Sequence, residues 1–123
     1  MLPGSELIGI GVDIISWDRI ERFLACHSFE FVKRLLKPSE QAAFLNAHAP
    51  ARFFARCFVA KEAYFKARAG KWMGEAGFRG IETLMEDEDQ FRIISNDSRT
   101  EGRFFETSEG ITAEVFVWKE TNL

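Results

Sequence analysis

The segment from Ala51 to about Ala69 constrains the fold more than any other part of the chain. It reads ARFFARCFVAKEAYFKARA, has neither glycine nor proline, and consists largely of residues that favour helices. Phe54, Phe58 and Phe65 recur at helical spacing among alanines. The sequence therefore predicts one long helix with these side chains on its buried face.

The residues before this segment predict a strand followed by shorter helices. Leu7 to Val12 is a short apolar run with β-branched residues, typical of a buried strand, and Asp13 follows at its expected C-terminal end. Apolar residues from Ser16 to Leu24 then recur at helical spacing. A second apolar pattern covers Phe29 to Leu36, and a further helix is expected from Pro38, which suits a first helical turn, to Pro50.

The second half of the chain changes from helix to strand patterns. The glycines between residues 70 and 80 predict a loop. Helices first and strands afterwards are typical of the α+β class, and 123 residues suffice for one compact core, so we expect a single domain over residues 1–123. Four alternating stretches are expected to form antiparallel strands: Ile81 to Met85, Phe91 to Ser95, Arg103 to Thr107 and Ile111 to Lys119.

The charge pattern excludes some classes of function. The net charge of −3 argues against a general nucleic-acid binder, although basic residues gather over residues 51–72 and acidic ones over 82–89. These clusters are either solvated faces or a basic helix that meets a phosphate or an acidic partner. Cys26 and Cys57 have neither zinc nor redox spacing. No apolar run is long enough to span a bilayer, so we expect a cytoplasmic protein without membrane contact.

Two carboxylates stand where hydrophobic packing is otherwise expected. Asp13 could simply cap the helix that follows it, and Glu62 in the long helix could simply pair with Lys66 one turn on. With Lys61 beside them, the same residues also suit Mg²⁺ that shares its coordination with a substrate phosphate, because Mg²⁺ takes one or two carboxylates while an ammonium neutralises the remaining phosphate charge. Both interpretations stay open on these residues alone.

Two motifs resemble the signatures of the holo-acyl-carrier-protein synthases, which are 4'-phosphopantetheinyl transferases. The first is GIGVDII at residues 9–15, continuing to Arg19-Ile20-Glu21. The second is FVAKEA at residues 58–63, continuing through Lys66-Ala67. The resemblance extends over roughly residues 8–95.

This resemblance implies a fold and an activity. The fold would be an antiparallel sheet packed against the long helix, in a homotrimer with active sites between adjacent subunits. The reaction would be a Mg²⁺-dependent transfer of the 4'-phosphopantetheine arm from coenzyme A to a serine of an apo-acyl carrier protein, with release of 3',5'-ADP.

The resemblance also implies roles for individual residues. Asp13 and Glu62 would hold Mg²⁺ and form the catalytic set together with Lys66, and Glu62 would take the serine proton directly or through a water. Lys61, Lys66 and Arg56 would bind the phosphates of coenzyme A. Three arginines would meet the acidic recognition helix of the carrier protein: Arg19, Arg22 and Arg34.

One departure from the family pattern keeps other hypotheses open. The family's late Ser-x-Ser/Thr-His element corresponds here to Phe104-Phe105-Glu106-Thr107, and no histidine follows His48. A diverged, non-catalytic member that binds a carrier protein or a nucleotide is therefore the alternative. A third possibility is an unrelated α+β protein in which Asp13 and Glu62 are a helix cap and a surface ion pair.

Overall fold

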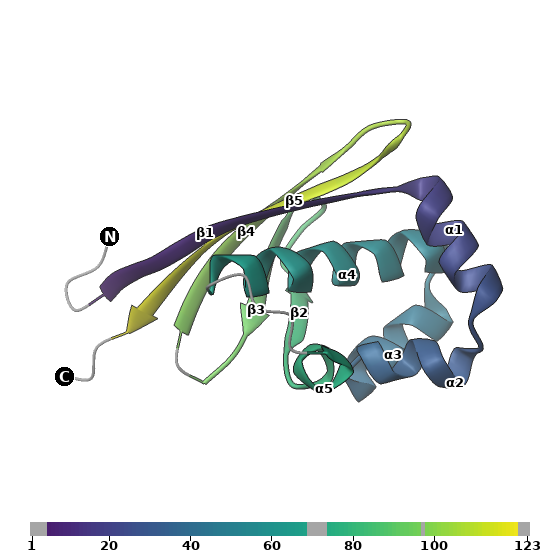
Figure 1. Cartoon of the computed structure of the whole chain (residues 1–123), viewed down its shortest axis with the longest axis horizontal. Coiled ribbons are helices and arrows are strands. Elements are labelled where there is room, and N and C mark those ends of the chain that lie inside the picture. The colour runs from purple at the N-terminus through teal and green to yellow at the C-terminus, as the bar shows by residue number, and fades with distance from the viewer. Residues whose placement is uncertain (1–4, 69–73, 97, 121–123) are drawn as a thin grey trace.

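The structure, a computed structural model, describes residues 5–68, 74–96 and 98–120 (Figure 1). One five-stranded antiparallel sheet has the strand order β1-β5-β4-β3-β2. Its strands are β1 (Ser5–Ser16), β2 (Glu82–Met85), β3 (Gln90–Ile94), β4 (Ser98–Glu106) and β5 (Gly110–Glu120). The helices are α1 (Trp17–Cys26), α2 (Phe29–Val32), the 3-10 helix η1 (Lys33–Leu35), α3 (Pro38–Asn46), α4 (Pro50–Ala67) and α5 (Gly74–Arg79). The predicted α+β class is confirmed.

The long helix α4 lies along one face of the sheet (Figure 1). It has a proline in its first turn and ends at Ala67, close to the predicted bounds. Phe54 and the small side chains of Ala60 and Ala63 are fully buried on α4. They join a core to which β5 contributes every second residue: Ile111, Ala113, Val115 and Val117. None of the helices in the described ranges is long and apolar enough to cross a membrane.

Strand β1 is longer than the sequence pattern predicted. It pairs with β5 through Ser16, so Asp13 lies in the interior of the strand, opposite Ala113. The predicted place of Asp13 at a strand end is therefore wrong. The strand continues because Ile14 and Ile15 keep the alternation of a β-strand, with Ile15 buried on the inner face and Ile14 69% exposed on the other.

The glycine-rich segment is not a loop throughout. Residues 69–73 lie outside the described part, but α5 occupies Gly74–Arg79, so the prediction of a continuous loop over residues 70–80 is wrong. Phe78 on α5 is fully buried, and its ring centroid lies 5.4 Å from that of Phe58 and 5.6 Å from that of Phe65. This aromatic contact attaches α5 to α4.

Strand β4 begins at Ser98, before the predicted start at Arg103. Its first half contains Thr100, a polar residue on the inner face that is buried nonetheless. The Thr100 hydroxyl accepts a hydrogen bond from the backbone N–H of Ile93 at 2.8 Å. Because a side-chain hydrogen bond replaces apolar packing there, the sequence shows no hydrophobic alternation.

The outer face of the sheet, opposite α4, remains accessible. Side chains of β1 on this face are largely apolar: Ile10 is 52% exposed, Val12 50% and Ile14 69%. Phe105 on β4 is 46% exposed, and Phe116 on β5 is half-buried. Within the described residues, no helix covers this face (Figure 1).

Candidate active site

Asp13 on β1 and two residues of α4, Glu62 and Lys66, come together where the helix crosses the strand. Lys66 Nζ donates a hydrogen bond of 2.7 Å to Asp13 Oδ1. The Asp13 side chain is 14% exposed, whereas that of Lys66 is 50% exposed. The contact therefore joins a nearly buried carboxylate to an ammonium group that still reaches solvent.

The electrostatics of Glu62 reflect a second carboxylate nearby. Burial raises the pKa of Glu62, and the negative charge of Asp13 raises it further, against the opposing charges of Lys66 and Arg19. The hydrogen bond to Asp13 raises the pKa of Lys66. Two acids thus share one restricted space with one ammonium group, and their mutual repulsion favours a bound cation.

The donor set fits a hard divalent cation whose coordination a substrate completes. Mg²⁺ commonly uses one or two carboxylates and takes its other ligands from phosphates and waters. In the described parts of the chain there is no cluster of three or more His, Cys, Asp or Glu side chains that could hold a metal ion. Asp13 and Glu62 therefore fit a site in which protein and substrate both supply ligands to the metal, rather than a site built from protein ligands alone.

The arginines that were predicted to bind the carrier protein lie on the exposed surface of the helical end of the molecule. Arg19 and Arg22 are exposed on α1, and Arg34 is exposed in η1. Arg22 Nη2 lies 3.2 Å from a carboxylate oxygen of Asp18, one turn earlier. Arg19 is near enough to Glu62 to influence its pKa. The arginine-bearing surface of α1 therefore adjoins the carboxylate site.

Lys61 does not join this site, although it was predicted to contact the phosphates of coenzyme A. The side chain is fully buried, and Nζ lies 2.6 Å from Glu40 Oε1. Nζ also donates to the backbone carbonyls of Leu35 and Phe78, each at 3.0 Å. All three ammonium hydrogens are therefore engaged. Adjacent helical residues point about 100° apart, so Lys61 enters the interior while Glu62 meets β1.

Glu40 is the partner whose role the sequence reasoning missed. It is 2% exposed, and its carboxylate also accepts hydrogen bonds of 2.7 Å from the backbone N–H groups of Lys37 and Thr83. Glu40 thereby links α3 to α4 and β2. Its position as the third residue of a proline-initiated helix is a capping signal that could have indicated it.

Arg56, which was also predicted to contact the phosphates of coenzyme A, is engaged within the chain. Arg56 is buried, donates to Glu106 Oε2 at 2.7 Å and to the backbone carbonyl of Glu88, and packs over the ring of Phe104. Arg52 donates to both oxygens of the same Glu106 carboxylate, at 2.8 and 2.7 Å. These contacts, that of Arg52 above all, lower the pKa of Glu106. The arginines are thus engaged by a carboxylate of the chain itself.

Thr107, which ends the stretch expected to correspond to the family's late Ser-x-Ser/Thr-His element, stabilises a turn. Its hydroxyl accepts hydrogen bonds from the backbone N–H groups of Glu109 and Gly110 at 3.1 and 3.3 Å. Its carbonyl accepts a 2.9 Å hydrogen bond from the indole of Trp17. This corner therefore connects α1 to the β4–β5 hairpin.

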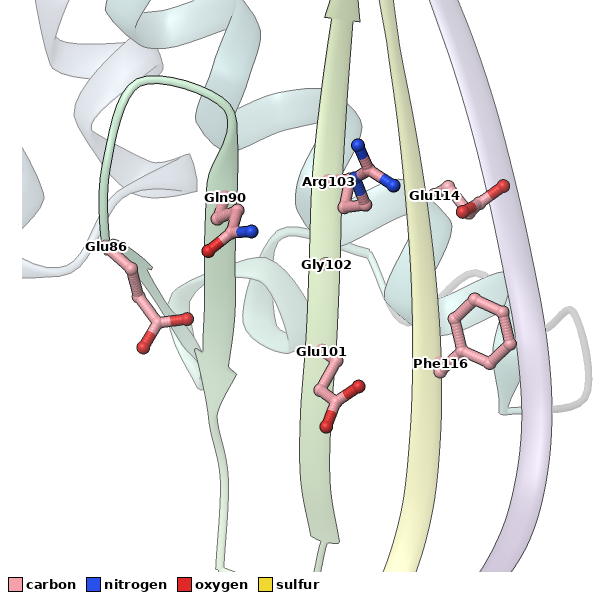
Figure 2. Close-up of a pocket in the computed structure, with 7 residues that line it drawn as sticks. All are labelled: Glu86, Gln90, Glu101, Gly102, Arg103, Glu114 and Phe116. Carbon is pink, nitrogen blue, oxygen red and sulfur yellow. The ribbon is translucent and has the colours of Figure 1, made fainter. Parts of the chain in front are cut away.

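A hollow of about 390 Å³ lies on the outer face of the sheet (Figure 2). It does not include Asp13 or Glu62. Two of its glutamates have arginine partners, Glu101 with Arg99 at 3.0 Å and Glu86 with Arg92 at 2.9 Å. None of the predicted site residues lines it. Its lining consists of Glu86, Gln90, Glu101, Gly102, Arg103, Glu114 and Phe116.

Known proteins of one family resemble this chain in sequence. Residues 9–120 match the family model described as the 4'-phosphopantetheinyl transferase superfamily. The holo-[acyl-carrier-protein] synthase of Aromatoleum aromaticum is 46% identical over 59 residues, which cover 48% of this chain and 47% of the relative. In that match the chain spans about half the length of its relative. The synthase of Thiobacillus denitrificans is 31% identical over 106 residues, covering 86% of this chain and 79% of the relative.

Solved structures of the same kind resemble the fold. A holo-[acyl-carrier-protein] synthase from Neisseria meningitidis gives a TM-score of 0.80 at 27% identity, over 91% of this chain and 98% of that one. A Bacillus anthracis synthase in complex with CoA (3',5'-ADP) gives 0.78 at 29% identity, over 93% and 98%.

Proposed function

The chain belongs to the 4'-phosphopantetheinyl transferase superfamily, and we propose that it is a holo-[acyl-carrier-protein] synthase. It would transfer the 4'-phosphopantetheine arm of coenzyme A to a serine of an apo-acyl carrier protein and release 3',5'-ADP. The observation that carries this proposal is the contact of Asp13 with Lys66 beside Glu62, because it joins the two sequence motifs in one place. The CoA (3',5'-ADP) in the Bacillus anthracis relative supports the choice of substrate.

Asp13 and Glu62 are the residues that would hold Mg²⁺. When bound, Mg²⁺ neutralises phosphate charge and stabilises the charge that develops during phosphoryl transfer. The raised pKa of Glu62 supports this assignment, because two ionised carboxylates are unfavourable there without a cation.

In the transfer, a bond forms between the serine oxygen and the phosphorus that bears the pantetheine arm. The bond from that phosphorus to the 3',5'-ADP leaving group breaks. Glu62 would accept the serine proton, directly or through a water, because it lies beside Lys66, which would hold the phosphate. Lys66 would donate a hydrogen bond to a phosphate oxygen, and its half-exposed side chain leaves room to do so.

The carrier protein would bind over α1. Its acidic recognition helix would meet Arg19 and Arg22, with Arg34 as a further contact, and opposite charges would speed the encounter. The nearness of Arg19 to Glu62 supports this arrangement, because the serine must reach the carboxylate site while the carrier is bound. No role for nucleic acid or a membrane is proposed.

A homotrimer is part of the proposal. The exposed apolar side chains of Ile10, Val12 and Ile14 support self-association through the outer face of the sheet, since water contact with such a face is unfavourable. A single domain over residues 1–123 and a cytoplasmic location stay predictions.

A second candidate is a diverged member that binds a carrier protein or a nucleotide without transferring the arm. Two observations favour it. No histidine follows His48 in the sequence, and Arg56 is engaged by Glu106 rather than open to a phosphate.

Release of 3',5'-ADP tests the proposal. The purified chain, coenzyme A, Mg²⁺ and an apo-acyl carrier protein are incubated together, and 3',5'-ADP is followed by chromatography. We expect release that requires both the carrier and Mg²⁺ and stops with a chelator. Carrier binding without 3',5'-ADP would instead support the non-catalytic member.

A further inference from the structure

We propose that Gly9 and Gly11 are positioning residues of the candidate site, because the absence of their side chains lets β1 lie directly on the backbone of α4. This inference rests on the proposed function, since it concerns the Asp13–Glu62 cation site. It gives the two glycines of the first motif a role in setting the distance between the carboxylates.

The three residues share one face of the strand. Side chains alternate along a strand, so Gly9, Gly11 and Asp13 all face α4. A Cβ atom built on Gly9 points at the carbonyl of Ala67, and one built on Gly11 points at the carbonyl of Ala63. Strand and helix therefore run past each other in opposite directions, and Asp13 continues the same row.

Backbone atoms of α4 occupy the space that a side chain on Gly9 or Gly11 would need. A Cβ on Gly11 would lie 1.8 Å from Ala63 O and 2.8 Å from Ala67 N, and a Cβ on Gly9 would lie 2.2 Å from Ala67 O. These atoms belong to the last turns of α4 and cannot turn aside as a flexible side chain can. The same closeness leaves no room for a phosphate at the Gly9-Ile10-Gly11 backbone on this face.

The glycines thus control where the two carboxylates meet. Gly11 lies two residues from Asp13, and Ala63 is adjacent to Glu62. A methyl group on Gly11 would move β1 away from α4, and the Asp13 side chain would move with it. A misplacement of about 1 Å in a site of this kind lowers rates on the order of 10²-fold.

Substitution by alanine tests the inference. Gly11→Ala is compared with the wild-type chain for Mn²⁺ binding in the presence of coenzyme A, measured by the loss of the free-ion electron paramagnetic resonance signal. We expect the Mn²⁺ dissociation constant to rise at least tenfold. Gly9→Ala should give a smaller rise, because its clash is with the carbonyl of the last helical residue. Folding of each variant is checked by urea denaturation.

Gly102→Ala is the matched control. A Cβ there would lie 2.3 Å from the ring of Phe91, so this variant also loses stability, but it lies on β4 away from the carboxylates. We expect it to keep wild-type Mn²⁺ affinity. The inference would be overturned if Gly11→Ala kept the wild-type Mn²⁺ affinity, or if Gly102→Ala lost as much Mn²⁺ affinity as Gly11→Ala. A wild-type chain that binds no Mn²⁺ would also overturn it. Failure of the proposed transferase would show differently, as normal Mn²⁺ binding without transfer.

Discussion

Lys66 Nζ lies 2.7 Å from Asp13 Oδ1, although 53 positions separate the two residues in the chain. The contact places the first motif, on β1, against the second motif, on α4. Glu62, one turn before Lys66, completes a group of two carboxylates and one ammonium. The two motifs therefore contribute to one site. The role of each motif can be tested by single substitutions.

Removing the charge of either carboxylate should slow transfer strongly without unfolding the chain. Asp13→Asn and Glu62→Gln keep the size of the side chain and remove its charge, so each should lower the rate of 3',5'-ADP release by at least about 10²-fold. Asp87→Asn, an exposed change in the turn between β2 and β3, is the control and should keep the wild-type rate. Nearly normal rates in both site variants would remove the carboxylates from the mechanism.

The raised pKa of Glu62 predicts how stability depends on pH in the absence of a metal. The folded chain holds a proton at Glu62 more tightly than the unfolded chain, so ionised Glu62 opposes folding. This penalty is absent below the ordinary value of 4.5 and complete above the raised folded value. The advantage of Glu62→Gln over wild type should therefore grow as pH rises through that interval. Urea denaturation in the presence of a chelator measures the free energy of unfolding of both proteins at each pH. A difference between the two proteins that stays constant with pH would contradict the prediction.

The buried pair of Lys61 and Glu40 should be structural. Lys61→Met leaves the Glu40 carboxylate buried without its cation and should lower the free energy of unfolding by about 3–5 kcal/mol. Adding Glu40→Gln removes the unpaired charge and retains a hydrogen-bond acceptor, so the double variant should be more stable than Lys61→Met alone. A double variant whose loss equals the sum of both single losses would show that the two charges do not interact.

Reversing charge on α1 should weaken carrier binding selectively. Arg19→Glu should raise the KM for the carrier protein on the order of tenfold, about 1.4 kcal/mol, with less effect on the KM for coenzyme A. The difference from wild type should shrink at high salt. Arg92→Glu, an exposed change on β3, is the control. Equal effects of the two variants would argue against a carrier surface on α1.

The long helix and the α+β class were predictable because their signals are local. Residues 51–69 combine helix-forming composition with helical spacing, and neither depends on distant partners. The length of β1 was not predictable from the polar character of Asp13, because the pairing with β5 extends the strand past it. The helix at 74–79 was hidden by glycines, and the burial of Phe78 against Phe58 and Phe65 stabilises it.

The site was predictable only where the residues of a motif face β1. Lys61 and Glu62 are neighbours with opposite charges, and composition cannot tell which of them enters the core. The rotation of α4 decides this, and it depends on the buried partner Glu40. The contact of Arg56 was not predictable for the same reason, because its partner Glu106 comes from a strand far along the chain.

The most direct measurement is the intact mass of an apo-acyl carrier protein after incubation with the chain, coenzyme A and Mg²⁺. We expect the carrier to gain the mass of one phosphopantetheine arm, and expect no gain when Mg²⁺ is omitted or when Glu62→Gln replaces the wild-type chain. An unchanged carrier mass with folded wild-type chain, for each of several carrier proteins, would contradict transferase activity and favour a member that only binds.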